Sequence, residues 1–253
     1  MRNIKLILQY DGTNFSGYEL QPGKRTIRGD LEQAIKKVFK KKISIVSSSR
    51  TDAGVHALQN VINFKTNQRI PVIKIPAALN SILPDDIRVL EAEEKKTSFN
   101  SRFDPKSKEY EYLIFNGEIL PPVLRGLTSH LKQKLDVPAM KKAAKCLVGK
   151  HDFSSFCAAG GDDINYVRII HSFVIRNSSF VIWRGSKFEV LSIRISGDGF
   201  LYKMVRNITG TLVDVGLGRI DPAEVEKILK AKDRRKAGRT APAQGLCLVK
   251  INY

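Results

Sequence analysis

The alternation of apolar and polar residues predicts that the chain begins with a group of strands interrupted by helices. Strands are predicted where β-branched or alternating apolar side chains lie between turn residues, at residues 6–10, 43–46, 61–64 and 87–92. A helix is predicted by the spacing of Leu31, Ile35, Val38 and Phe39, and a shorter one within residues 71–82. We expect this first domain to cover residues 1–104 and to end in a connector at Phe103-Asp104-Pro105.

A second group of elements is predicted over residues 105–253. Tyr110, Tyr112 and Ile114 alternate with Glu109, Glu111 and Leu113, as the two faces of one strand do. Further strands are predicted at residues 167–176, 189–196 and 246–251, and a loop at the acidic residues 160–163. Helices are predicted at residues 138–148, capped by Asp136 and stopped by Gly149, at residues 200–215, ended by Gly216, and at residues 223–230. Both groups mix strands with one or two helices, so we predict an α+β protein of two similar lobes that share a sheet.

The charge of the chain favours a polyanionic partner. Its 253 residues include 43 Lys and Arg against 25 Asp and Glu, which gives a formal net charge of +18. Neutralising phosphates releases condensed counterions, so a nucleic acid fits this excess, although an anionic membrane surface satisfies the same arithmetic. The sequence has no apolar run of about 18 residues and its first residues lack the apolar stretch of a signal peptide. We therefore expect a cytoplasmic protein with no membrane segment.

Metal and cofactor motifs are missing from the sequence. The three cysteines, at positions 146, 157 and 247, lie far apart without C-x-x-C spacing, and the four histidines are equally scattered. Neither a G-x-G-x-x-G segment nor a phosphate-binding P-loop occurs. We expect no disulfide framework, no metal and no cofactor.

The best candidate for an active site is a polar loop, residues 47–57, between the apolar runs 43–46 and 61–64. It offers Asp52, Arg50 and Gly54 within five residues. A nearby cation stabilises the ionised form of a carboxylate, so Asp52 beside Arg50 can serve as a nucleophile or a base. Gly54 allows the backbone a positive φ or a close approach to a ligand. The alternative is a capped turn in which Asp52 only bonds its own backbone.

This loop is one of six short segments whose order along the chain is informative. They are residues 10–18 with Gln21-Pro22, 49–57, 108–112, 149–156, 200–207 and 240–246. The second contains R-T-D-x-G-V-H-A, the third is K-x-Y-x-Y and the fourth is G-x-H-D-F-x-x-F. In these blocks, which span nearly the whole chain, the sequence resembles the tRNA pseudouridine synthase A family.

The resemblance implies both a fold and an activity. The fold is two ferredoxin-like halves joined through one continuous, mostly antiparallel sheet flanked by helices, with the active-site cleft between the halves. The activity is isomerisation of uridine to pseudouridine in the anticodon stem-loop of tRNA, at about positions 38 to 40, without a cofactor. The resemblance also implies a homodimer whose two subunits grip one tRNA.

The resemblance assigns roles to four residues. Asp52 is the catalytic nucleophile or base, Arg206 is its charge partner, and Tyr110 stacks on the target base. Arg50 displaces the base or contacts a phosphate. Each of the last three has an ordinary alternative: a core aromatic for Tyr110, an exposed arginine with a packed stem for Arg206, and a loop salt bridge for Arg50. His151 and Asp152 are interpreted as structural rather than as a catalytic pair.

Two groups of basic residues complete the candidate features. The densest group precedes residues 240–242 and consists of Lys232, Arg234, Arg235, Lys236 and Arg239. It is either a solvated loop or a phosphate-binding edge that contributes affinity without sequence readout. Lysines 36, 37, 40, 41 and 42 are interpreted as a solvated basic face that suits the dipole at the end of the helix, with direct RNA contact as the alternative. Without the resemblance, a non-catalytic RNA-binding protein and a hydrolase acting through Asp52 on a phosphorylated small molecule remain alternatives.

Overall fold

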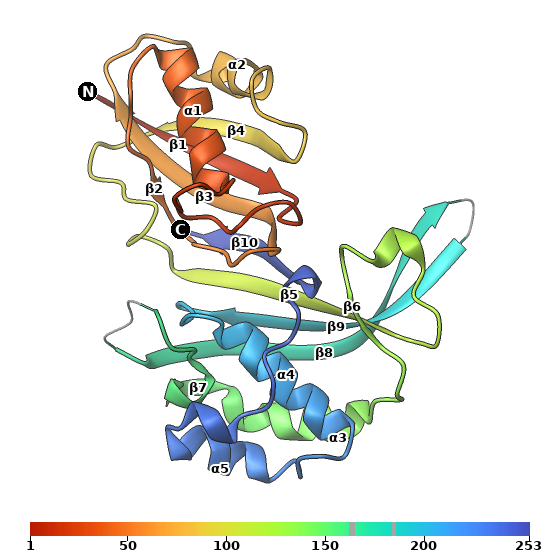
Figure 1. Cartoon of the computed structure of the whole chain (residues 1–253). Helices are drawn as coiled ribbons and strands as arrows, with labels where there is room; N and C mark the ends of the chain where they lie inside the picture. Colours follow the sequence, from red (N-terminus) through yellow and green to blue (C-terminus); the bar gives the residue numbers. More distant parts are fainter. Residues whose placement is uncertain (162–164, 184–185) are drawn as a thin grey trace. The chain divides into compact units, whose positions relative to one another are not determined.

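A computed structural model describes residues 1–161, 165–183 and 186–253 (Figure 1). The chain forms two compact units. The first contains Met1–Lys106 and Cys247–Tyr253, and the second contains Ser107–Leu246. Each unit combines a mostly antiparallel sheet with a few helices, so the α+β class predicted from the sequence is confirmed.

The first unit is built on strands β1 (Arg2–Tyr10), β3 (His56–Thr66), β4 (Ile87–Lys95) and β10 (Leu246–Asn252). Their order is β4-β1-β3-β10, and the short strand β2 (Val46–Ser47) also pairs with β3. All of these pairs are antiparallel except that β10 runs parallel to β3. Because of that pairing the last strand belongs with the first unit, whereas the sequence-based division grouped it with residues 105–253.

Helix α1 (Ile27–Phe39) covers the sheet of the first unit. Thr26 caps its start, since the Thr26 side chain accepts a hydrogen bond from the amide of Gly29. Its apolar face is buried, and the rings of Phe39 and Phe64 meet edge to face at 5.2 Å. The expected shorter helix is a 3₁₀ turn, Val72–Lys74, followed by α2 (Ile75–Asn80).

The strand predicted at residues 43–46 is largely wrong. Only Val46 and Ser47 form a ladder, with Asn63 and Ile62. Ile43 and Ile45 are buried, but as irregular backbone. A short apolar run signals burial, and burial alone does not require a strand.

The second unit contains four strands in the order β5-β9-β8-β7, with β6 added parallel to β5. Their bounds are β5 Ser107–Asn116, β6 Ser129–Leu131, β7 Gly149–Asp152, β8 Val167–Trp183 and β9 Ser186–Gly197. The helices are α3 (Val137–Ala144), α4 (Met204–Gly216) and α5 (Glu224–Ala231). Short 3₁₀ turns lie at Pro122–Leu124, Lys145–Leu147, Ser154–Phe156, Arg234–Lys236 and Ala243–Gly245.

Two helix predictions in this unit need correction at their ends. Asp136 caps α3 as expected, accepting from the amide of Ala139 at 2.9 Å, but the last predicted turn is a 3₁₀ turn. Helix α4 begins at Met204 rather than near residue 200, because Lys203 adopts a left-handed conformation with φ of 57°. Arg206 therefore lies in the first turn of α4 and not in its middle.

The acidic loop expected at residues 160–163 is described only in part, because positions 162 and 163 lie outside the described residues. No helix in the described part of the chain has the length and apolar character needed to cross a membrane.

Candidate active site

The loop that carries Asp52 connects β2 to β3 at one end of the first unit's sheet. It turns sharply, with the amide of Val55 donating to the carbonyl oxygen of Asp52 at 3.2 Å. Gly54 has a φ of 79°, which confirms the expected need for glycine. Asp52 is half-buried, so its carboxylate lies in a fixed turn that solvent still reaches.

Contacts with residues 10–18 and 21–22, here called the amino-terminal block, hold this loop in place. The amide of Tyr18 donates to the carbonyl oxygen of Thr51 at 2.9 Å, and the hydroxyls of Tyr10 and Thr51 are 2.8 Å apart. Gly12 lies directly against the loop, since a Cβ added there would be 2.0 Å from the carbonyl oxygen of Val55. Only a residue without a side chain permits this approach.

A buried asparagine supports the loop from β3. The side-chain amide of Asn60 donates to the carbonyl oxygen of Ser49 at 3.0 Å and to the hydroxyl of Tyr10 at 3.2 Å. Asn60 is fully buried, so both bonds are shielded from water. Ser49 and Thr51, which both precede the turn, are therefore tied to the sheet.

His56, the first residue of β3, links the end of the loop to the Asp11 turn. Its Nδ1 is 3.2 Å from the amide nitrogen of Gly12, which donates to it, and 3.1 Å from Oδ1 of Asp11. The same nitrogen accepts from Gly12 when the ring is neutral and can donate to Asp11 only when it carries a proton. Burial raises the pKa of Asp11, but bonds from Thr13 and the nearby His56 outweigh it and lower the pKa overall.

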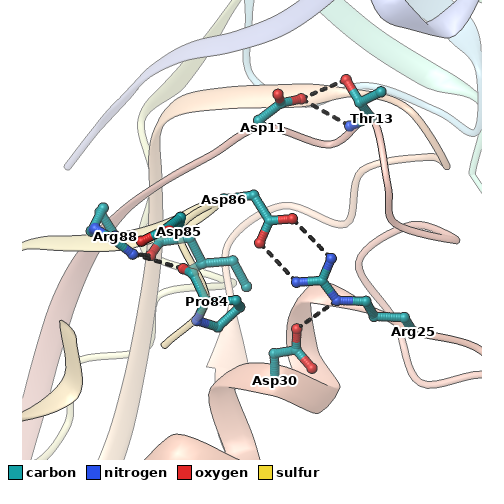
Figure 2. A network of polar contacts seen from close by, with 9 residues as sticks. Asp11, Thr13, Arg25, Asp30, Pro84, Asp85, Asp86 and Arg88 are labelled. Atoms are coloured by element: carbon teal, nitrogen blue, oxygen red, sulfur yellow. Dashed lines mark hydrogen bonds and ion pairs between the residues drawn. The ribbon is translucent and has the colours of Figure 1, made fainter. Parts of the chain in front are cut away.

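Arg25 anchors the amino-terminal block from the outside (Figure 2). Its two terminal nitrogens donate to the carboxylate of Asp86 at 2.8 Å each, and its Nε donates to Asp30 at 3.0 Å. The guanidinium also lies 4.1 Å from the centre of the Phe15 ring, and the amide of Asp11 donates to the Asp86 carbonyl oxygen. Arg25 thus connects the amino-terminal block, which contacts the Asp52 loop, to α1 and to the start of β4.

Arg50 is exposed and makes an ion pair within the first unit. Its Nε lies 3.1 Å from Oε1 of Glu19, and Glu19 also pairs with Arg28 at 2.9 Å. The loop salt bridge that the sequence left open for Arg50 is therefore present. Exposed pairs of this kind contribute about 0–1 kcal/mol, so exchanging Glu19 for another anion costs Arg50 little.

Tyr110 lies on the buried face of β5 in the second unit. The alternation predicted from the sequence holds, with Tyr110, Tyr112 and Ile114 buried. The Tyr110 ring meets that of Phe200 edge to face at 5.2 Å. Phe200 precedes α4, so the ring of Tyr110 is fixed by the loop that leads into the helix of Arg206.

Arg206 is fixed to the segment that follows the basic cluster. Its Nε donates to the carbonyl oxygen of Ala241 at 2.8 Å, and the amide of Ala241 donates back to the Arg206 carbonyl oxygen at 3.1 Å. The next residue, Pro242, accepts from the hydroxyl of Tyr112 at 2.8 Å. Burial raises the pKa of Tyr112 to about 12 and Arg206 opposes that rise.

One member of the basic cluster is structural. Arg234 donates to the side chains of Asn207 at 3.0 Å and Thr240 at 3.1 Å, and also to the carbonyl oxygens of Ala237 and Gly238. Burial lowers the pKa of the Arg234 guanidinium. The other four side chains are exposed: Lys232, Arg235, Lys236 and Arg239. Lys232 pairs with Asp152 and Arg235 with Asp233, at 3.1 and 2.8 Å.

The His151-Asp152 pair has structural contacts. Nε2 of His151 is 2.9 Å from the carbonyl oxygen of Val148, and Asp152 bonds both Ser154 and Lys232. Within the described residues, no group of three or more histidine, cysteine or acidic side chains could hold a metal ion.

Comparison with known proteins identifies the family. The family model described as tRNA pseudouridine synthase matches residues 6–104 and 143–253. The chain belongs to the tRNA pseudouridine synthase family. The protein named tRNA pseudouridine synthase A from Thermoanaerobacter sp. (strain X514) is 46% identical over 253 residues, covering all of both chains. Its namesake from Bacillus subtilis (strain 168) is 45% identical over 252 residues, covering 99% of this chain and 98% of that one.

The matched residues contain Asp52, Arg50 and Arg206, whereas Tyr110 falls between the two matched stretches. Asp52 and Arg50 lie in the first unit of this family member, and Tyr110 and Arg206 lie in the second. Sequence reasoning found these four residues but missed the supports of the loop and of α4. These supports are Tyr10, Gly12, His56, Asn60, Asn207 and Arg234. The glycines at positions 12 and 17 mark places where the backbone can pack closely, but no local pattern shows which residues these supports contact.

Proposed function

We propose that this tRNA pseudouridine synthase acts on uridines in the anticodon stem-loop of tRNA, at about positions 38 to 40, with Asp52 as its nucleophile or base. Similarity over the full length of the relatives supports the reaction and the substrate class. The geometry of its loop supports this role for Asp52. The half-exposed residue lies in a turn whose backbone is held on both sides, by Tyr18 at Thr51 and by Gly12 at Val55.

The reaction rearranges one nucleotide without a change in oxidation state. The bond between ribose C1′ and uracil N1 breaks, the base turns, and a bond forms between C1′ and C5. The proton on C5 is released to solvent and N1 gains a proton, so atoms and charge balance. Asp52 can begin this sequence by attacking the ribose, by attacking the base or by removing a ribose proton. A uridine in a stem must first be flipped out, which costs about a few kcal/mol.

Three further side chains are proposed to serve the same reaction. Tyr110 stacks on the displaced base, Arg206 is the charge partner that orients Asp52, and Arg50 exchanges Glu19 for a phosphate or displaces the base. The fixed ring of Tyr110 and the anchored Nε of Arg206 support these roles, because catalytic groups need locked orientations. In the same proposal, the two units are the ferredoxin-like halves on either side of the cleft, and a cytoplasmic homodimer grips each tRNA.

Tritium release from uridine C5 tests the function. We expect wild-type protein to release tritium from tRNA labelled at C5, and Asp52→Asn to bind the same tRNA without releasing tritium. Asp85→Asn is the matched control, because it removes the same charge from an exposed side chain that bonds only Arg88 among the described residues. Equal loss in both variants would contradict the assignment of Asp52.

The same assay separates the alternative classes. A non-catalytic RNA-binding protein would retain all tritium with every tRNA, in wild type as in Asp52→Asn. A hydrolase would instead release phosphate from small phosphate esters. Either result with folded wild-type protein would overturn the proposed reaction.

A further inference from the structure

We propose that a basic groove at the end of the first unit's sheet opposite Asp52 binds backbone phosphates of the same tRNA, at a distance from the target uridine. This inference rests on the proposed function, because it takes the ligand at Asp52 to be a tRNA. The groove is a hollow of about 610 Å³ within the first unit. It lies between residues 41–46, the carboxyl end of β3 and residues 97–100.

Three lysines line the groove, and no carboxylate does. Lys41, Lys42 and Lys65 are exposed, and no aspartate or glutamate is among the lining residues. In the part of the chain that the structure describes, none of these lysines forms an ion pair. By contrast, Lys5 and Lys95 of the same sheet both pair with Glu93, at 3.3 and 2.5 Å. The groove therefore concentrates positive charge that the fold itself does not neutralise.

The walls of the groove combine apolar side chains with polar groups, and hydrogen bonds within the protein hold part of the polar lining in place. Asn63, at the base, is buried, donates to Asn3 at 2.8 Å and accepts from the amide of Ser101 at 2.9 Å. The remaining polar lining consists of hydroxyl and amide side chains, which donate to phosphate and sugar oxygens. A groove with lysines, neutral hydrogen-bond donors and no carboxylates can bind the phosphates of a nucleic acid without recognising its bases.

The strand registers place the groove far from the catalytic loop. Tyr10 pairs with Ala57 next to the Asp52 loop, and Arg2 pairs with Thr66 at the groove. Strand β3 contains 11 residues, which at about 3.4 Å per residue separates the two ends by roughly 35 Å. A few nucleotides around the target uridine cannot reach both ends, whereas an extended folded RNA can.

This assignment divides the lysine run of the sequence analysis into two parts. Lys36 and Lys37 lie on α1, where basic residues in the last turn favour the helix dipole, and they remain a solvated face. Lys40 ends the helix in a left-handed conformation with φ of 54°. The helix ends there, and Lys41 and Lys42 are among the residues that line the groove.

Substitution of the three groove lysines tests the proposal. The variant Lys41→Gln, Lys42→Gln, Lys65→Gln is compared with Lys141→Gln, Lys142→Gln, Lys145→Gln, which removes the same charge from exposed positions of the second unit. Both are made with and without Asp52→Asn. Dissociation constants come from the inactive forms, and kcat comes from the active forms. The two ligands are full-length tRNA and its isolated anticodon stem-loop.

The groove variant should weaken binding of full-length tRNA at least about tenfold at 0.1 M salt. The slope of log Kd against log salt should fall by about two to three, since each of the three lost phosphate contacts removes about 0.7–0.9. Binding of the stem-loop and kcat at saturation should stay unchanged. Equal losses for tRNA and stem-loop, equal losses in the control variant, or unchanged tRNA binding would each overturn the proposal. Failure of wild type to release tritium would instead overturn the proposed function.

Discussion

Replacing Gly12 with alanine is expected to displace the Asp52 loop and to slow catalysis. The added Cβ would be 2.0 Å from the carbonyl oxygen of Val55, whereas real Cβ atoms essentially never come within 3.0 Å of another heavy atom. One of the two backbones must therefore move by at least about 1 Å. Val55 bonds Asp52 directly, and the Gly12 side is held through Asp11 and Asp86. The displacement therefore reaches the Asp52 turn.

A misplacement of about 1 Å in a catalytic group costs about 100-fold in rate. We expect Gly12→Ala to lower kcat by about that factor, and overpacking to cost about 1–3 kcal/mol of stability. Single-turnover tritium release at saturating enzyme measures the rate, and filter binding measures tRNA affinity. Affinity should change little, because Gly12 supports the reacting group rather than the bulk of the RNA contact.

Gly23→Ala is the matched control, directly after the amino-terminal block. Gly23 has a φ of 67° and no atom within 4 Å of an added Cβ, so alanine there incurs backbone strain of about 1–2 kcal/mol without a clash. It should reduce thermal stability and leave kcat near that of wild type. Our reasoning is refuted if folded Gly12→Ala keeps wild-type kcat, or if both variants lose the same rate.

Three further predictions follow from other contacts. His56→Ala leaves the buried amide of Gly12 without its acceptor, so it should cost about 1–3 kcal/mol in thermal unfolding and also lower kcat; unchanged stability would contradict the contact. Burial raises the pKa of Tyr112 to about 12, above the pKa of about 10 of an unfolded tyrosine. Below about pH 10 the neutral hydroxyl therefore favours the folded state by about 2–3 kcal/mol. This contribution is lost as the pH rises towards 12. Tyr112→Phe should flatten that loss in urea unfolding between pH 9 and pH 11.5, and an unaltered pH profile would count against it. Arg234→Gln should lower the melting temperature, because it removes partly buried hydrogen bonds to Asn207 and Thr240. Arg239→Gln should weaken tRNA binding and leave the melting temperature unchanged, because the Arg239 side chain is exposed. The reverse pattern would refute the division of the basic cluster into a structural arginine and exposed cations.

The sequence predicted most elements because their apolar periodicity is local information. The Tyr110 strand, the Asp136 cap and the positive φ of Gly54 each depend on residues within a few positions, and each was predicted correctly. The start of α4 was misplaced because a lysine, Lys203, adopts the left-handed conformation usually left to glycine. No local sequence pattern indicates the left-handed conformation of Lys203.

The supports of the site could not be predicted because their partners lie far away in the chain. Gly12 meets Val55, and Arg234 bonds Asn207. A basic run looks the same in sequence whether its members are solvated or, like Arg234, partly buried. The loop of Asp52 could be located from its composition, but the contacts that fix it depend on the tertiary fold.

The parallel pairing of β10 with β3 has a consequence for synthesis on the ribosome. Cys247 and Leu248 lie beside His56 and Ala57, the residues that directly follow the Asp52 loop. The carbonyl oxygen of Asn252 also accepts from the amide of Lys106 at 2.8 Å. A nascent chain therefore cannot complete the unit that carries Asp52 until residues 246–252 have left the exit tunnel, so partly made chains should be inert towards tRNA.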